Sequence, residues 1–267
     1  MKILSIGFGF VGKAYSFYLR EAGHDVSVLT KNDATKIDAQ NYGFKEAKTN
    51  GGFDAAIIAV PTPTHGNFFD ASIIKAAVEK AVETYGCRNI IIKSTILPGT
   101  TKSLKAAHPK AEFYFYPEFL EAQKAIGGVF NQKIVVFGND AWNPKKIEFI
   151  KDLFKVAEPN TTNYETAETI KYAHNLWLAS NISFWNSMMR TSAPTVDFDF
   201  LLKEIHKSDY FGTHPWKIGG AYGGECLPKD IGAYVGNIKT ESEYKNLLEA
   251  VDKVNKKVAL EGNKQNK

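Results

Sequence analysis

The sequence predicts an α/β fold in which a doubly wound parallel sheet comes first and an all-helical domain follows. Two observations lead to this prediction. Short apolar runs alternate with amphipathic segments over the first 160 residues, and a glycine-rich turn follows the first run. After about Asn160 the alternation stops and only helical patterns remain. We therefore predict an α/β domain over residues 1–160 and a helical central domain over residues 161–267.

The predicted elements follow from the apolar periodicity. Short buried strands that alternate with longer amphipathic helices are typical of a parallel sheet covered on both faces. The predicted strands are Lys2–Ile6, Val26–Leu29, Ala55–Val60, Asn89–Lys93, Glu112–Tyr116 and Ile134–Phe137. The predicted helices of the second part are Glu165–Arg190, Asp197–His206, Lys229–Ile238 and Ser242–Leu260.

The composition excludes several classes of protein. The 267 residues are 44% hydrophobic and 23% charged with a net charge of +4, as in ordinary globular proteins. The basic residues are scattered and no nucleic-acid motif occurs, so we expect no nucleic-acid partner. Cys87 and Cys226 lack the spacing of a zinc site or a disulfide framework, so we expect no metal and a reducing compartment.

The chain also lacks the signs of a membrane protein. Glycines and Lys13 interrupt the apolar N-terminal run, which argues against a secretory signal. No stretch approaches 18 uninterrupted apolar residues. We expect a cytoplasmic protein that does not enter the membrane.

The first predicted strand runs into a G-x-G-x-x-G turn and then a helix. Here Gly7 permits the tight turn, Gly9 leaves room for a pyrophosphate and Gly12 lets the helix pack closely on the strand. This context predicts a dinucleotide-binding domain of the Rossmann type over residues 1–160. The residues expected to contact the cofactor in this turn are Gly7, Phe8, Gly9, Phe10, Val11 and Gly12.

The end of the second strand normally carries an acidic residue that binds the ribose hydroxyls of NAD. Here this position is Thr30, followed by Lys31, and both are predicted to lie beside the cofactor. A threonine and a lysine tolerate the 2′-phosphate of NADP, which an aspartate would repel. We predict NAD as the cofactor with NADP possible, and Asp33 is an alternative ribose ligand.

Three further loops follow predicted strands. The carboxyl ends of parallel strands line the ligand crevice of an open sheet, so these loops should surround the cofactor and its substrate. We predict cofactor contacts from Val60, Pro61, Thr62 and Thr95, and substrate contacts from Glu118, Phe119 and Leu120.

A cysteine near the C-terminal end stands in the string Gly223–Asp230. Glycines beside a thiol allow a substrate to approach the main chain, while Lys229 and Asp230 supply charge next to it. The pattern suggests a covalent catalyst at Cys226. The alternative is a small buried apolar side chain without a chemical role.

Together with the helix Thr166–Asn175, these loops and the Cys226 string resemble the UDP-glucose/GDP-mannose dehydrogenase family, in order from residue 1 to about 260. The resemblance implies that NAD or NADP oxidises the primary alcohol of a sugar nucleotide to a carboxylate in two hydride transfers. The thiol would hold the intermediate aldehyde as a thiohemiacetal, which is oxidised to a thioester that water then cleaves.

The resemblance also implies roles for individual residues. Cys226 matches the nucleophile and Glu118 the general base of thioester hydrolysis. Lys171 and Asn175 are four residues apart on one helix face and match the pair that stabilises an oxyanion. Thr95 and Asp230 match residues that hold the water and the reacting oxygen, although Asp230 is equally consistent with a helix N-terminal cap. The implied substrate contacts are Glu118, Phe119, Leu120, Lys171, Asn175, Gly223, Gly224 and Cys226.

The chain departs from the family pattern at three places. A second acid of the Pro-Glu-Phe-Leu-x-Glu motif is replaced by Ala122, with Glu121 one place early. Because one residue rotates a helical side chain by roughly 100°, we expect that Glu121 does not substitute for it. An arginine expected to hold the substrate is replaced by Tyr210. The chain ends at Lys267, where relatives are expected to continue into a third, nucleotide-binding domain.

These departures keep two alternative functions open. One is a two-electron hydroxy-acid or alcohol dehydrogenase of the β-hydroxyacid type, which needs no Cys226. The other is a non-catalytic NAD-binding assembly protein. We also expect a homodimer through the helical domain, since one apolar stripe on Ser242–Leu260 needs a cover, either a partner or the chain's own long helix. The stripe contains Leu247, Leu248, Val251, Val254 and Val258.

Overall fold

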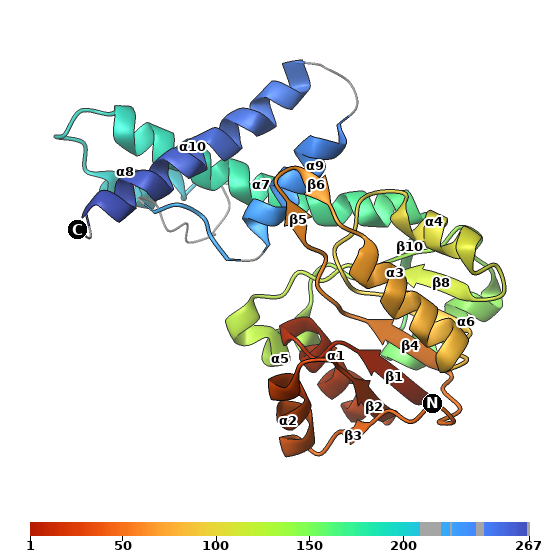
Figure 1. The fold of residues 1–267 in the computed structure, drawn as a ribbon. Helices are drawn as coiled ribbons and strands as arrows, with labels where there is room; N and C mark the ends of the chain where they lie inside the picture. The colour runs from red at the N-terminus through yellow and green to blue at the C-terminus, as the bar shows by residue number, and fades with distance from the viewer. Residues whose placement is uncertain (209–219, 225, 239–242, 266–267) are drawn as a thin grey trace. The chain divides into compact units, whose positions relative to one another are not determined.

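The computed structural model describes residues 1–208, 220–224, 226–238 and 243–265 (Figure 1). The chain divides into two compact units, each described by itself below. The first contains residues 1–65 and 69–171, and the second contains residues 66–68 and 172–267. The division falls within one long helix, so the boundary at residue 160 stays a prediction.

The first unit is built on a sheet of eight strands in the order β10-β9-β8-β7-β4-β1-β2-β3. The strands from β8 to β3 in this order are parallel, as the sequence predicts. Their bounds, with those of the two edge strands, are β1 Lys2–Ile6, β2 Asp25–Leu29, β3 Lys45–Glu46, β4 Ala55–Ile58, β7 Asn89–Ile92, β8 Glu112–Phe115, β9 Val136–Gly138 and β10 Asn160–Thr162.

Two strands at one edge differ from the predicted all-parallel arrangement. Strand β9 runs antiparallel to β8, and β10 is parallel to β9. Between β8 and β9 the structure has only α5 (Ala125–Gly128) and the 3-10 turns Ala122–Lys124 and Val129–Asn131. A parallel connection usually crosses over through a longer helix; here the chain instead returns beside β8 in the opposite direction.

Helices cover both faces of the sheet, and each face has its own core. One core joins Ile3 and Ile57 of the sheet to Tyr15 and Phe154 of the helices. The other joins Leu4 and Ile58 to residues of α3 and α4. The strands are therefore buried on both faces, as a doubly wound fold requires. The helices are α1 Phe10–Glu21, α2 Asp33–Asn41, α3 Ser72–Glu79 with a π-helical turn Lys80–Thr84, α4 Thr100–Ala107 and α6 Pro144–Phe154.

The second unit is helical. Helix α7 (Tyr164–Thr191) starts in the first unit and belongs to the second from Tyr172 onwards. It is followed by α8 (Phe198–Ile205), α9 (Leu227–Asn237) and α10 (Glu243–Gln265). The predicted start of the last helix, Ser242, lies outside the described residues, and the helix continues past the predicted end at Leu260.

The apolar stripe on α10 is partly covered by the same chain. Val251 and Val258 are buried, while Leu247 is 67% exposed. The Ser183 hydroxyl of α7 donates to the Val251 carbonyl at 2.9 Å. The sequence leaves two covers open for this stripe, a partner chain and the chain's own long helix. At Val251 the cover is the long helix α7.

A β-hairpin extends from the first unit. It is formed by β5 (Thr64–His65) and β6 (Phe68–Phe69), and its tip, residues 66–68, belongs to the second unit. Gly236 of α9 lies so close to the tip that a Cβ there would stand 1.9 Å from the Asn67 carbonyl oxygen. Only glycine allows this approach, so α9 and the hairpin tip are packed main chain to main chain.

The first turns of α7 are anchored to the sheet domain by a buried carboxylate. Glu168 is fully buried and accepts three hydrogen bonds at the start of α4: from Gly99 N at 2.6 Å, Thr101 N at 2.9 Å and the Thr101 hydroxyl at 2.6 Å. The two main-chain donors, Gly99 N and Thr101 N, are among the N–H groups that a helix start leaves without intrahelical partners. Burial raises the pKa of Glu168 to about 7, against the opposing effect of the bonds to Thr101 and Gly99.

This pKa predicts a pH-dependent stability. The unfolded Glu168 loses its proton near the ordinary value of 4.5, and the folded one near 7, so the free energy of unfolding should fall as the pH rises between these values. The loss is at most about 3 kcal/mol, at roughly 1.4 kcal/mol per pH unit. Urea unfolding at both ends of this range should show the fall in the wild type and a smaller fall in Glu168→Gln. Equal falls in both proteins would contradict the assignment.

Candidate active site

The loops predicted to form a site emerge at one edge of the sheet. Strands β8, β7, β4, β1 and β2 are consecutive neighbours and parallel, so their carboxyl ends lie side by side. Gly7 follows β1 and Thr30 follows β2. The segments after the other three strands carry Val60, Lys93 and Tyr116. In an open parallel sheet this edge holds the ligand.

The glycine turn has the geometry of a dinucleotide cradle. Gly7 has φ +92°, and a Cβ there would lie 2.2 Å from the Ala59 carbonyl oxygen. A Cβ at Gly12 would lie 2.1 Å from the Gly7 oxygen, while a Cβ at Gly9 would meet nothing within 4 Å. The strand and helix are thus packed as closely as glycine allows, with open space beside Gly9, which fits a pyrophosphate.

The side chains of this turn differ in exposure. Phe8 is 1% exposed and belongs to the core, whereas Phe10 and Val11 are half-buried and pack against it. A cofactor contact from Phe8 would therefore come from its main chain.

No carboxylate stands at the end of β2. The Thr30 hydroxyl lies 2.7 Å from that of Thr35, and Asn32 caps α2 by accepting a hydrogen bond from Thr35 N at 3.2 Å. Lys31 and Asp33 are exposed, and Asp33 is the first residue of α2. The position that binds the ribose in NAD domains is thus a hydroxyl flanked by a lysine.

The loops after β4 and β7 are joined by side-chain hydrogen bonds. The buried Thr62 hydroxyl donates to the Thr95 carbonyl at 2.7 Å. The Ser94 hydroxyl accepts from Val60 N at 2.9 Å and donates to Val60 O at 2.8 Å. Thr95 itself is half-buried and Pro61 is exposed. Four of the predicted cofactor residues, at positions 60–62 and 95, are therefore held in one rigid pair of loops.

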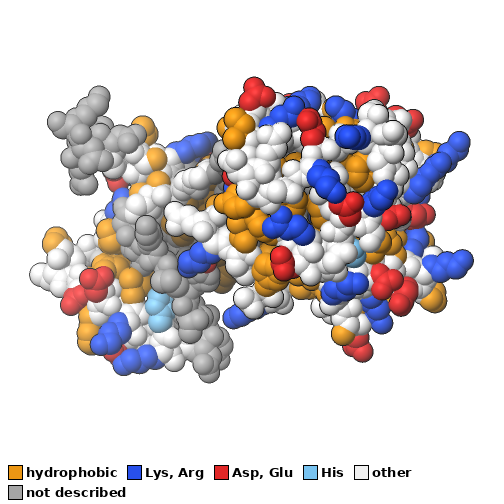
Figure 2. All heavy atoms as spheres, turned by 90° about the horizontal axis from the view of Figure 1, so that it is seen from below, with side chains coloured by type: hydrophobic (Ala, Val, Ile, Leu, Met, Phe, Trp, Pro, Cys, Tyr) orange, Lys and Arg blue, Asp and Glu red, His pale blue; other side chains and the backbone are white. Residues whose placement is uncertain are grey.

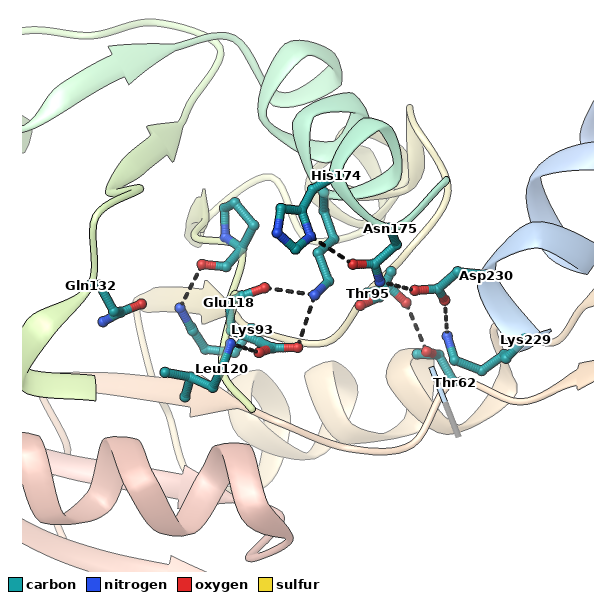
Figure 3. Close-up of polar contacts among 12 residues, drawn as sticks. Thr62, Lys93, Thr95, Glu118, Leu120, Gln132, His174, Asn175, Lys229 and Asp230 are labelled. Atoms are coloured by element: carbon teal, nitrogen blue, oxygen red, sulfur yellow. Dashed lines mark hydrogen bonds and ion pairs between the residues drawn. The ribbon is translucent and has the colours of Figure 1, made fainter. Parts of the chain in front are cut away.

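A buried ion pair lies at the end of β8. Lys171 Nζ is 3.0 Å from Glu118 Oε1 and donates to the Glu118 carbonyl at 2.6 Å (Figure 3). The other carboxylate oxygen accepts from Leu120 N at 2.8 Å, and Lys171 stands 5.3 Å from the Phe119 ring centre. The Lys171 and Glu118 side chains are 5% and 6% exposed. The structure thus brings together four predicted substrate residues: Glu118, Phe119, Leu120 and Lys171.

Lys93 is part of the same cluster, and the sequence analysis gave it no role. Its amino group donates to the Pro117 carbonyl at 3.0 Å and lies over the Tyr15 and Tyr116 rings. Burial holds the pKa of Lys93 well below its ordinary value; Glu118 opposes the shift and Lys171 adds to it. The sequence signal that could have found it is a lysine directly after the three isoleucines that end β7.

In the second unit, an amide–carboxylate pair joins α7 to α9. Asn175 Nδ2 donates to Asp230 Oδ2 at 2.6 Å, and Lys229 Nζ donates to Asp230 Oδ1 at 2.5 Å (Figure 3). His174 Nδ1 lies 3.0 Å from Asn175 Oδ1. Asp230 is 1% exposed and stands in the first turn of α9, where a helix favours negative charge. Of the roles considered from the sequence, the helix-dipole partner and the reaction partner are compatible with this place. Asp230 is not the N-cap, because Cys226 holds that position and the Asp230 carboxylate binds Asn175 and Lys229.

Cys226 is the N-cap residue, directly before the first residue of α9. It is half-buried, its carbonyl accepts from Asp230 N at 2.8 Å, and a negative charge at this helix end is stabilised by the helix dipole. Gly223 and Gly224 are exposed, the latter with φ +76°, and residue 225 lies outside the described part. Cys87, in contrast, is fully buried, and burial raises its pKa to about 12.

Two of the predicted departures can be compared with the structure. Glu121 is exposed, adopts an extended conformation and pairs with Lys124 at 3.3 Å, so it does not join the Glu118 cluster. Ala122 begins a 3-10 turn rather than an α-helix, so the helical rotation used in the sequence argument does not describe this segment. Tyr210 lies outside the described residues.

Metal binding, membrane crossing and surface charge can be assessed for the described part of the chain. Its residues contain no group of His, Cys, Asp or Glu that could hold a metal ion. No helix within it is long and apolar enough to cross a bilayer. On the face drawn in Figure 2, basic and acidic side chains are interspersed.

Comparison with known proteins finds family models that match both the N-terminal and the C-terminal part of the chain. The model of the NAD binding domain of the UDP-glucose/GDP-mannose dehydrogenase family matches residues 39–158, and that of its central domain matches residues 165–257. The chain belongs to this family. The matched ranges contain Thr95, Glu118, Lys171, Asn175 and Cys226, and most of the first unit falls within the family's NAD-binding domain, a Rossmann fold.

Individual relatives span most of this chain. UDP-glucose 6-dehydrogenase YwqF of Bacillus subtilis is 29% identical over 96% of this chain and 66% of its own length. UDP-glucose 6-dehydrogenase of Campylobacter jejuni is 27% identical over 89% and 68%. The solved UDP-glucose dehydrogenase of Pyrobaculum islandicum has the same fold, with a TM-score of 0.83 and 24% identity over 96% and 68%. The chain thus spans about two thirds of the length of these relatives.

The geometry at β2 predicts how cofactor preference can be changed. Thr30→Asp should weaken NADP binding at least about tenfold, because a carboxylate repels the 2′-phosphate, while NAD binding is kept or improved. Dissociation constants from calorimetry would measure this. Asp33→Asn serves as the control: a loss of NAD affinity in this variant would assign the ribose to Asp33 instead. Unchanged NADP affinity in Thr30→Asp would contradict the prediction.

Proposed function

We propose that this chain oxidises the primary alcohol of a sugar nucleotide of the UDP-glucose kind to a carboxylate, with NAD as cofactor and NADP tolerated. The observation that carries the proposal is the buried Lys171–Glu118 pair at the cofactor edge of the sheet. Glu118 provides an acceptor for protons. Lys171 and, one helical turn later, Asn175 provide donors for a developing oxyanion. Membership of the family supplies the reaction class.

Each group has a defined task in the proposed reaction. When bound, NAD would supply the oxidising power by taking a hydride in each of the two oxidations. In the first, the alcohol also releases its hydroxyl proton to water as the aldehyde forms. The Cys226 thiolate adds to the carbonyl carbon of the aldehyde, and the resulting oxyanion is stabilised by Lys171 and Asn175 before it takes a proton. This tetrahedral adduct would then lose its hydroxyl proton to water and a hydride from carbon to the bound cofactor, which leaves a thioester on Cys226.

Hydrolysis completes the reaction. Glu118 takes a proton from water, whose oxygen attacks the thioester carbon; the carbon–sulfur bond breaks and the thiolate of Cys226 is restored. Glu118 is suited to this step because Lys171 and Leu120 N hold both its carboxylate oxygens in place. Thr95 and Asp230 are proposed to position the water and the reacting oxygen.

Turnover with UDP-glucose tests the function. Two reduced cofactors per sugar are expected from absorbance. Cys226→Ala should abolish the reaction, whereas Cys87→Ala, which removes the buried thiol, should keep it. One reduced cofactor per substrate with activity retained in Cys226→Ser would select the two-electron dehydrogenase. Cofactor binding without turnover on any sugar nucleotide, together with a stable complex with another chain, would select the assembly protein.

We also propose a homodimer through the helical unit, with α7 as the main contact. Three large apolar side chains of α7 are exposed at spacings of seven and four residues: Trp177 by 65%, Phe184 by 52% and Met188 by 37%. Such spacing places them along one stripe, and a second copy of the same stripe would cover it. We propose this stripe of α7 as the dimer contact in place of the α10 stripe, because the chain itself already buries part of the latter.

The oligomeric state measures this contact. Sedimentation should give a dimer for the wild type and a monomer for Phe184→Glu, because a charge would be buried at the centre of the stripe. Leu247→Glu, at an apolar position of α10 that is still more exposed than Phe184, is the control and should remain dimeric. A monomeric wild type at micromolar concentration would contradict the proposal.

A further inference from the structure

A buried lysine of the sheet domain has no task in the proposed reaction. Lys93 follows β7 directly and is 1% exposed, although lysine is rarely buried without a compensating partner. Its amino group lies 3.3 Å from the centre of the Tyr116 ring and 3.8 Å from that of the Tyr15 ring. The third contact is the hydrogen bond to the Pro117 carbonyl at 3.0 Å.

The two rings around Lys93 are themselves fixed. The Tyr15 hydroxyl donates to Gln132 Oε1 at 2.7 Å, and Gln132 Nε2 donates to the Tyr116 hydroxyl at 3.3 Å and to the Val129 carbonyl at 3.0 Å. The rings meet edge to face, with centres 5.6 Å apart. We call Tyr15, Tyr116 and Gln132 the tyrosine box. The two rings cover the buried amino group, whose hydrogen bond goes to the Pro117 carbonyl.

The Pro117 carbonyl belongs to the peptide that leads into Glu118. A peptide group is planar, so fixing its oxygen fixes the orientation of the following main-chain N–Cα bond. The next carbonyl, that of Glu118, accepts from Lys171 at 2.6 Å (Figure 3). Two buried amino groups therefore hold two successive carbonyls, one on each side of the Glu118 Cα. Pro117 has no N–H, so this turn cannot be fixed by a main-chain donor there.

We propose that Lys93 is a positioning residue: from within the tyrosine box it holds the Pro117 carbonyl and so fixes Glu118 in the orientation in which it binds Lys171. Its effect on turnover rests on the proposed function, whereas its effect on Glu118 does not. Lys93 touches neither cofactor nor substrate in this assignment. Its removal should impair the steps that use Glu118 and leave binding intact.

The test uses Lys93→Met, which keeps the length of the side chain and removes the donor. With UDP-glucose and NAD, kcat should fall about a hundredfold, as misplacement of a reacting group by about 1 Å does. The KM for UDP-glucose and the dissociation constant for NAD should stay within about twofold. The matched control is Lys146→Met, which should keep kcat. It removes another largely buried lysine amino group of the same domain, one that is paired with Glu112.

A second measurement needs no turnover. In urea unfolding, Lys93→Met and Glu118→Gln should be non-additive by at least a factor of ten in the unfolding equilibrium constant, whereas Lys146→Met and Glu118→Gln should be additive. If the wild type lacked turnover, the proposed function would fail and this cycle alone would decide on Lys93. Additivity in the first cycle, or a kcat of folded Lys93→Met within threefold of the wild type, would overturn the proposal.

Discussion

The buried ion pair between Lys171 and Glu118 is the contact on which the rest of the site depends. Removing both charges from water costs several kcal/mol per group, and leaving one of them without its partner costs about 3–5 kcal/mol. The pair is therefore stable only where its surroundings satisfy every remaining polar atom. Leu120 N provides a donor for the second carboxylate oxygen, and the Glu118 carbonyl takes another bond from Lys171. The carboxylate is consequently held in one orientation before any ligand arrives.

The sheet and α7 each contribute one side of this pair. Glu118 is placed by β8 and by the Lys93 bond to the preceding carbonyl. Lys171 is placed by α7, whose first turns are fixed by Glu168 on the N-terminus of α4. Residues 168 and 171 are three apart, so they lie on one helix face. The anchoring of the first turns of α7 therefore also fixes the place of Lys171 within the first unit.

The parts of the fold that were predictable are those with a strong local pattern. β1 was predicted with its observed bounds, because an apolar run ending in Gly7 leaves little choice. The edge strands β9 and β10 were not, since their direction depends on the connection rather than on their own residues. Glu168 lies in a helix that the sequence predicts. Nothing in the neighbouring residues shows that its carboxylate accepts from Thr101 at the start of α4, 67 residues earlier in the chain. Polar contacts between residues far apart in the chain leave no periodic pattern in the sequence, so they are not predicted from it.

The central claim is that Glu118, held by Lys171, cleaves a thioester formed on Cys226. The most direct test is the intact mass of Glu118→Gln after incubation with UDP-glucose and NAD, followed by peptide mapping. Because hydrolysis would be blocked after both oxidations, a uronyl adduct of the sugar nucleotide should accumulate on Cys226 and be absent from Cys87. An unmodified Cys226 in a variant that still reduces NAD would contradict the account.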